Sequence, residues 1–142
     1  TDDLRLTCGA TINRSTIDEP TRFSSPRISH VPNIAEFSGR MGLEYSRSVG
    51  RDLDLDARVW ASYIGKSRLG VGPELGDPQG DYVDSGMLVR IGNERFGGTL
   101  SVTNLAGTEG NRFALGTPFA VLREQVTPLR PRTIRLGVDF SF

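Results

Sequence analysis

The dominant pattern along the chain is alternation of apolar and polar residues, which is typical of β-strands. It is clearest at the C-terminal end, where apolar side chains occupy every even position between Thr133 and Phe142. The same period of two recurs in five earlier stretches of the sequence. Together these stretches predict strands at residues 4–17, 36–49, 52–66, 81–92, 96–105 and 132–142. We expect most of these strands to run ten residues or more.

The connections between these strands are alternately short and long. The short ones are Gly50-Arg51 and residues 93–95, and the long ones are residues 18–35, 67–80 and 106–131. Long strands joined in turn by tight turns and long loops are typical of outer-membrane barrels, in which a strand needs about 9–11 residues to cross. The pattern therefore predicts an all-β fold, an antiparallel up-and-down transmembrane β-barrel segment of about six strands.

Aromatic residues support this interpretation because they gather near the predicted strand ends. Tyr45, Phe96, Phe140 and Phe142 fall near the short turns, and Phe37 and Tyr63 fall near the long loops. Two such belts are expected where a barrel meets the two membrane–water interfaces. Tyr82 has the parity of the polar face and does not belong to them. Alternation alone also fits a soluble β-sandwich, in which the apolar faces of two sheets meet in a dry core.

Composition excludes several function classes. The 17 basic and 17 acidic residues cancel, which argues against a nucleic-acid partner because such a protein needs a concentrated basic face. Cys8 and His30 are each the only residue of their type, so clustered Cys/His metal sites cannot be built. We find no defensible catalytic set, and we expect no enzyme activity, no bound metal and no cofactor.

Two motifs are candidates for binding sites, but the residues around them support neither assignment. Asp52, Asp54 and Asp56 share one strand face, but a Ca²⁺ site would need more oxygen ligands converging from a loop. We interpret them as solvated carboxylates at a rim. The glycine-rich stretch 70–76 is not followed by Lys-Ser/Thr or by a helix, so a phosphate-binding loop is not predicted.

The C-terminal residues resemble a known family. Residues 132–142 resemble the terminal strand of outer-membrane barrels, in which Arg135, Gly137, Phe140 and Phe142 match the signal that the barrel assembly machinery reads. More narrowly, the stretch from Thr99 to the end resembles the last two strands of TonB-dependent receptors. The phrases that carry this resemblance are Leu100-Ser-Val-Thr-Asn-Leu105, residues 111–119 and residues 127–133, together with Val31-Pro32-Asn33 before the second strand. The family usually has an acidic or aromatic residue where this chain has Ala106-Gly107, which bears on loop shape.

The resemblance implies a barrel of about 22 strands with a plug folded inside it. Residues 1–142 would be the C-terminal portion of that barrel, a segment of a longer protein in which the plug and the TonB-contacting region lie elsewhere. It also implies the outer membrane of a Gram-negative bacterium and transport of a scarce ligand, such as an iron–siderophore, vitamin B12 or an oligosaccharide, driven through TonB. The expected partners are outer-membrane lipid, TonB, the barrel assembly machinery and the small-molecule ligand.

An anionic iron chelate would need positive charge partners. The candidates are Arg40, Arg112, Arg123 and Arg130. Three other classes stay open: a passive porin-like barrel without a plug, a soluble β-sandwich binding module, and a hydrolytic outer-membrane barrel. The absence of a credible Ser/His pair from the sequence counts against the hydrolase.

Overall fold

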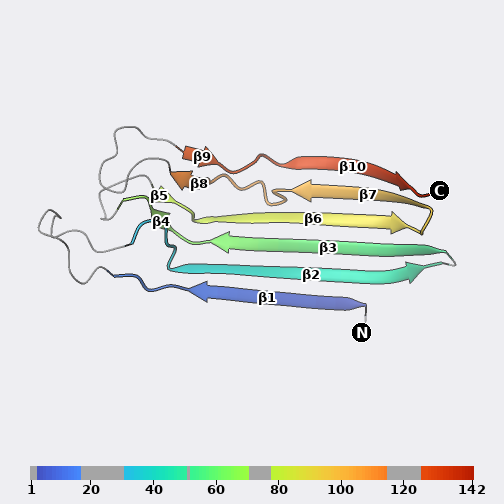
Figure 1. Ribbon diagram of the computed structural model, residues 1–142, viewed down its shortest axis with the longest axis horizontal. Helices are drawn as coiled ribbons and strands as arrows, with labels where there is room; N and C mark the ends of the chain where they lie inside the picture. Colours follow the sequence, from blue (N-terminus) through green and yellow to red (C-terminus); the bar gives the residue numbers. More distant parts are fainter. Residues whose placement is uncertain (1–2, 17–30, 51, 71–77, 115–125) are drawn as a thin grey trace, which may run out of the picture.

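The computed structural model describes residues 3–16, 31–50, 52–70, 78–114 and 126–142, whose regular structure is antiparallel β-sheet (Figure 1). Six strands form one sheet in the order β1-β2-β3-β6-β7-β10, which confirms the predicted all-β, up-and-down arrangement. Their bounds are β1 Leu4–Ile12, β2 Phe37–Val49, β3 Leu53–Ile64, β6 Tyr82–Gly92, β7 Phe96–Thr103 and β10 Thr133–Phe140. Among the described residues, no helix is long and apolar enough to cross a membrane.

Several predicted strand ends are wrong. The strand predicted to reach residue 17 ends at Ile12, which is paired with Phe37, the first residue of its partner strand. The strand predicted to reach residue 105 ends at Thr103, because Asn104 takes a left-handed backbone conformation with φ of 51°. The last strand ends at Phe140 rather than at residue 142. The starts predicted at residues 4 and 96 and the ends predicted at residues 49 and 92 are confirmed, and the remaining bounds are one or two residues too long.

The lengths of the strands also correct the expectation that most exceed ten residues. β2, β3 and β6 have 13, 12 and 11 residues, whereas β1, β7 and β10 have 9, 8 and 8. The shorter strands gain further backbone hydrogen bonds beyond their ends: Ser46 N–H donates to the Asp3 carbonyl, Asn13 N–H to the Glu36 carbonyl, Leu105 N–H to the Ser85 carbonyl, and Ser141 N–H to the Arg95 carbonyl. Strand length is therefore weaker support for a membrane-spanning sheet than the sequence indicated.

The connections divide the sheet into a short-turn end and a long-loop end (Figure 1). At the short-turn end, the Asn93 side-chain oxygen accepts hydrogen bonds from the N–H groups of Arg95 and Phe96, at 2.9 and 3.0 Å. At the long-loop end lie two small sheets that the sequence did not predict. They pair β4 (Ser67–Arg68) with β5 (Pro78–Gln79), and β8 (Asn111–Ala114) with β9 (Val126–Pro128).

All the apolar stripes fall on one face of the six-stranded sheet. One row of directly opposed residues crosses every strand: Leu6, Leu43, Val59, Met87, Val102 and Ile134. Directly opposed residues project to the same side, so the apolar stripes form a continuous apolar face. Much of it is open to the surroundings, with Leu6 63% and Leu136 83% exposed. The six strands lie in a single layer (Figure 1). Among the described residues, the face is covered only near the start of β6, where the Ala106 N–H donates to the Ser85 hydroxyl and Ser85 and Val102 are each 7% exposed.

Candidate functional site

The opposite face of the sheet, the polar face, carries most of the charged side chains of the strands. Arg5, Glu44 and Arg58 stand opposite one another on β1, β2 and β3. Glu44 pairs with Arg58 at 2.8 Å and lies 3.9 Å from Arg5. Because both arginines remain well exposed, with 79% and 62% of the side chain accessible, these pairs contribute little to stability. The three side chains therefore add charge to the polar face but contribute little to the stability of the sheet.

Long side chains of the polar face lie flat over glycines of the neighbouring strands. The pairs are Arg40 over Gly9, Trp60 over Gly86, and Arg90 over Gly97. A Cβ atom at Gly97 would stand 2.5 Å from the Arg90 Nη2 atom, and one at Gly86 would enter the indole ring of Trp60. The glycines thus keep the polar face low in relief. Trp60, which breaks the alternation of β3, is accommodated in this way.

An ion pair links β10 to β6 across the strand between them. The Arg90 guanidinium donates to both carboxylate oxygens of Asp139, at 3.3 and 2.7 Å, and to the Asn93 carbonyl at 3.2 Å. Asp139 is opposite Gly97 on β7, so the side chains meet over that glycine. Two parallel hydrogen bonds fix the geometry of a guanidinium–carboxylate pair. This ion pair therefore links β10 to β6 at the short-turn end, in addition to the backbone hydrogen bonds between β10 and β7.

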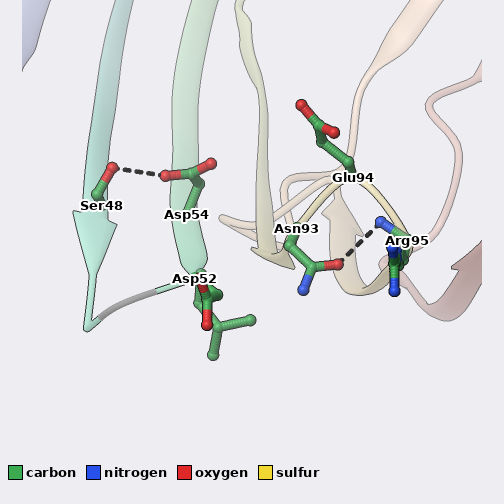
Figure 2. Close-up of a pocket in the computed structure, with 7 residues that line it drawn as sticks. Ser48, Asp52, Asp54, Asn93, Glu94 and Arg95 are labelled. Atoms are coloured by element: carbon green, nitrogen blue, oxygen red, sulfur yellow. Dashed lines mark hydrogen bonds between the residues drawn. The ribbon is translucent and has the colours of Figure 1, made fainter.

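The acidic triplet lies on and beside β3 at the same end. The Ser48 hydroxyl donates to Asp54 at 2.6 Å, and the Ser46 hydroxyl donates to Asp56 at 2.5 Å. An open hollow of about 510 Å³ lies beside the first pair, and its lining includes Asp52, Asp54 and Arg95 (Figure 2). The described residues contain no group of three or more His, Cys, Asp or Glu side chains that could hold a metal ion.

The arginines expected to bind an anionic ligand are placed in two locations. Arg40 lies on the polar face, near the start of β2. Arg112 belongs to β8, and Arg130 lies just beyond the end of its partner strand β9, so both are at the long-loop end. All three are exposed. Arg123 lies outside the described residues.

The residues of the expected assembly signal occupy an edge strand. Arg135 and Gly137 are on the polar face of β10, while Phe140 is on the apolar face, directly opposite Phe96. Phe142 follows the strand and is fully exposed. A Cβ atom at Gly137 would meet only the Thr99 side chain, at 3.9 Å, which is ordinary contact.

Asn104 organises the long-loop end, a role that sequence reasoning missed. This side chain is 4% exposed, and its amide group donates to the carbonyls of Thr108 and Arg130, at 2.9 and 2.8 Å. Its oxygen accepts from the Thr108 N–H at 2.9 Å. The residue thus joins the end of β7 to the segment that returns into β10. The available signal was an Asn directly after a strand, where a left-handed conformation is tolerated.

Asn111 plays a similar part for the small sheets. Its amide group donates to the Pro78 carbonyl at 3.2 Å, and its side-chain oxygen accepts from the Thr127 N–H at 3.0 Å. The backbone of Asn111 also accepts from the Gly80 N–H at 2.9 Å. Elements separated by long stretches of sequence are therefore held together at the bases of the loops.

A second open hollow, of about 860 Å³, lies where the apolar face meets the long-loop end; we call it the border hollow. Its lining includes Val31, Ile34, Glu36, Phe37, Tyr63, Lys66, Arg68, Gln79, Asp81 and Asn111. The Tyr63 hydroxyl donates to Asp81 at 3.0 Å, and the Lys66 ammonium lies 3.2 Å from the same carboxylate. These two contacts hold the pKa of Asp81 below its usual range.

Comparison of the chain with protein-family models, with curated proteins and with solved structures found no match. A function is therefore inferred from the two faces of the sheet and from its long-loop end. One face is apolar and largely exposed, and the other is charged and low in relief.

Proposed function

We propose that this chain is part of the wall of a plugged β-barrel, the C-terminal portion of a TonB-dependent transporter in the outer membrane of a Gram-negative bacterium. The observation that carries the proposal is the continuous apolar face of the six-stranded sheet, most of whose large side chains are exposed, from Leu6 on β1 to Leu136 on β10. Apolar surface in water is unfavourable by about 25 cal/mol per Å². Acyl chains would cover such a face in an outer-membrane barrel.

A soluble β-sandwich would cover the same face with a second sheet. The other two sheets in the described residues have two strands each, and both lie at the long-loop end (Figure 1). Figure 1 places neither of them over the middle of the six-stranded sheet. This arrangement favours lipid over a second sheet as the surroundings of the apolar face.

The low relief of the polar face favours a plugged barrel over an open, porin-like one. Water fills any contour, so a wet pore does not require long side chains to lie flat over glycines. A folded plug can lie close to the wall only where the wall is smooth, and glycines in strands often mark such close approach. Trp60 over Gly86 and Arg90 over Gly97 meet this requirement on neighbouring strands.

The orientation of the sheet can be tested by spin labels on two adjacent residues of β3. In the full-length protein with Cys8→Ser, labels at Val59→Cys and Arg58→Cys would project to the apolar and the polar face, respectively. We expect oxygen, which concentrates in lipid, to relax the label at position 59 more strongly. A water-soluble nickel chelate should relax the label at position 58 more strongly. Recovery of the protein in the soluble fraction, or equal access of the chelate to both labels, would contradict the membrane assignment.

Transport can be tested through the exposed arginines of the long-loop end. We expect Arg112→Gln combined with Arg130→Gln to lower uptake of an anionic iron chelate about a hundredfold or more, because each of the two charge-assisted hydrogen bonds lost contributes about 1.5–3 kcal/mol. The measurement is uptake of labelled iron by cells expressing the full-length protein, with and without TonB. Arg95→Gln, at the short-turn end, is the matched control and should transport normally. The Arg40→Gln variant tests the polar face separately.

Each outcome of this experiment bears on a different part of the proposal. Uptake that does not depend on TonB would replace the active transporter with a passive barrel. TonB-dependent uptake that is unchanged by the arginine variants would remove these residues from the ligand site while leaving the transporter in place.

A further inference from the structure

Hydrogen bonds join the bases of the three long connections to one another. The described parts of these connections are residues 31–36 (first), residues 65–70 and 78–81 (second), and residues 104–114 and 126–132 (third). Among the described residues, hydrogen bonds run from the first connection to the second and from the second to the third, and none joins the first directly to the third. The second connection therefore lies between the other two in this network.

A short segment of the second connection, β5 and the residue after it, holds both neighbours. The Pro78 carbonyl accepts a hydrogen bond from the Asn111 side chain at 3.2 Å, and the Gly80 N–H donates to the Asn111 carbonyl at 2.9 Å. Between these two residues, the Gln79 side chain donates to the Asn33 side-chain oxygen at 2.7 Å. Three consecutive residues thus bind the third connection through their main chain and the first through a side chain.

The first connection is also held by β4, the partner of β5. The Asn33 N–H donates to the Arg68 carbonyl at 2.8 Å, and β4 pairs with β5 through Ser67 and Gln79. Asn33 is thus fixed by both strands of this small sheet, its backbone by β4 and its side chain by β5. The position of the first connection therefore depends on the second.

Close packing leaves little freedom for separate movement. Gln79 is 5% exposed, so a shift of Asn33 would break a buried hydrogen bond. A Cβ atom at Gly80 would collide with the Gly65 carbonyl, and one at Gly65 would collide with the Phe37 carbonyl. The backbone of the second connection is therefore packed against the start of β2 without intervening side chains.

We propose that residues 78–80 couple the first connection to the third, so that the bases of the three long connections open as one cooperative unit. In such a unit every amide becomes accessible to solvent through the same opening event. Coupling between two sites is reciprocal, so a change at either end alters the other by the same factor. An occupant held by Arg112 and Arg130 would therefore also stabilise residues 31–36. This consequence rests on the proposed function, whereas the coupling itself does not.

Two single substitutions in the full-length protein test the coupling from opposite ends. Asn111→Ala removes the side-chain hydrogen bonds with Pro78 and Thr127. Gln79→Ala removes the side-chain hydrogen bond with Asn33. The first variant thus loses contacts of the third connection, and the second loses a contact of the first connection.

The readout is hydrogen exchange of the protein in detergent, measured by mass spectrometry on peptides covering residues 31–36 and 126–130. We expect each variant to accelerate exchange about tenfold in both peptides, because the loss of one or two hydrogen bonds destabilises the whole unit. Exchange within β3 should stay unchanged, which shows that the six-stranded sheet is intact. Asn93→Ala removes two side-chain hydrogen bonds at the short-turn end; it is the matched control and should alter neither peptide.

The outcomes separate this inference from the proposed function. Acceleration confined to the peptide whose own hydrogen bond was removed, or absent from both peptides, would overturn the coupling. If Asn111→Ala unfolds the sheet, Asn111→Asp, which keeps an acceptor for the Thr127 N–H, is judged by the same criterion. A protein recovered from membranes whose two peptides respond independently contradicts the coupling alone. A protein whose peptides respond together but which is not recovered from membranes contradicts the proposed function alone.

Discussion

Replacing Gly86 with valine is expected to destabilise the sheet by about 2 kcal/mol, within the range for overpacking a close contact. A Cβ atom at this position enters the space of the Trp60 indole ring, so the ring has to leave the surface of β6. No small adjustment suffices, because the ring lies directly over the glycine. The displaced ring would project from the polar face, where the proposed plug would lie.

The matched control for this substitution is Gly98→Val on the neighbouring strand. A Cβ atom at Gly98 meets nothing within 4 Å, and the residue lies on the apolar face between Ile91 and Val138. Urea unfolding of the purified full-length protein in detergent would compare the two variants. Equal losses of unfolding free energy would show that Trp60 does not depend on Gly86. Adding Trp60→Ala to Gly86→Val should recover part of the loss, because the double variant removes the clash.

Replacing Asn104 with aspartate should be still more disruptive, with a loss of about 3 kcal/mol. The Asn104 amide donates to two carbonyl groups, those of Thr108 and Arg130. Aspartate would lose both hydrogen bonds and place a carboxylate oxygen against both carbonyls. Losing a buried hydrogen bond costs about 1 kcal/mol, and an unsatisfied or repelled buried group costs about 1–3 kcal/mol more.

Asn93→Asp is the control for the Asn104 substitution. The Asn93 side-chain oxygen accepts from two backbone N–H groups, and aspartate keeps an acceptor there. Hydrogen exchange and limited proteolysis of the full-length protein should therefore show loss of protection at residues 104–112 and 126–132 in Asn104→Asp only. Equal protection in both variants would contradict the role assigned to Asn104. Asn104→Gly, which suits the φ of 51°, should fall between wild type and aspartate.

The sequence predicted the strands and their order because the pleat of a β-strand imposes a period of two on any half-buried sheet. It did not predict where the strands end, since partners decide this. β1 stops where β2 begins, and β7 stops where the Asn104 side chain reaches a carbonyl 26 residues further along the chain. Trp60 breaks the alternation of β3. Only the strand register shows that Gly86, which leaves room for the indole ring, lies opposite it.

The candidate site was predicted unevenly for a related reason. Arginines such as Arg112 and Arg130 could be chosen by charge, but only the structure shows that one lies in β8 and the other just beyond its partner strand β9. The border hollow could not be predicted from sequence, because its lining comes from separate connections that meet only through long-range bonds, such as those from the Gly65 N–H to the Phe37 carbonyl and from the Asn33 N–H to the Arg68 carbonyl. The local alternation of apolar and polar residues therefore predicts the sheet, whereas the candidate site depends on pairing between residues that are far apart in the sequence.

The directions of the two outermost strands constrain how the sheet can close on itself. β1 runs toward the long-loop end and β10 runs away from it, as their arrowheads in Figure 1 show. If further strands close the sheet by connecting β1 to β10, their number must therefore be even for every pair of neighbouring strands to be antiparallel. An odd number of added strands would leave one pair of neighbouring strands parallel, and a two-residue hairpin cannot connect parallel neighbours.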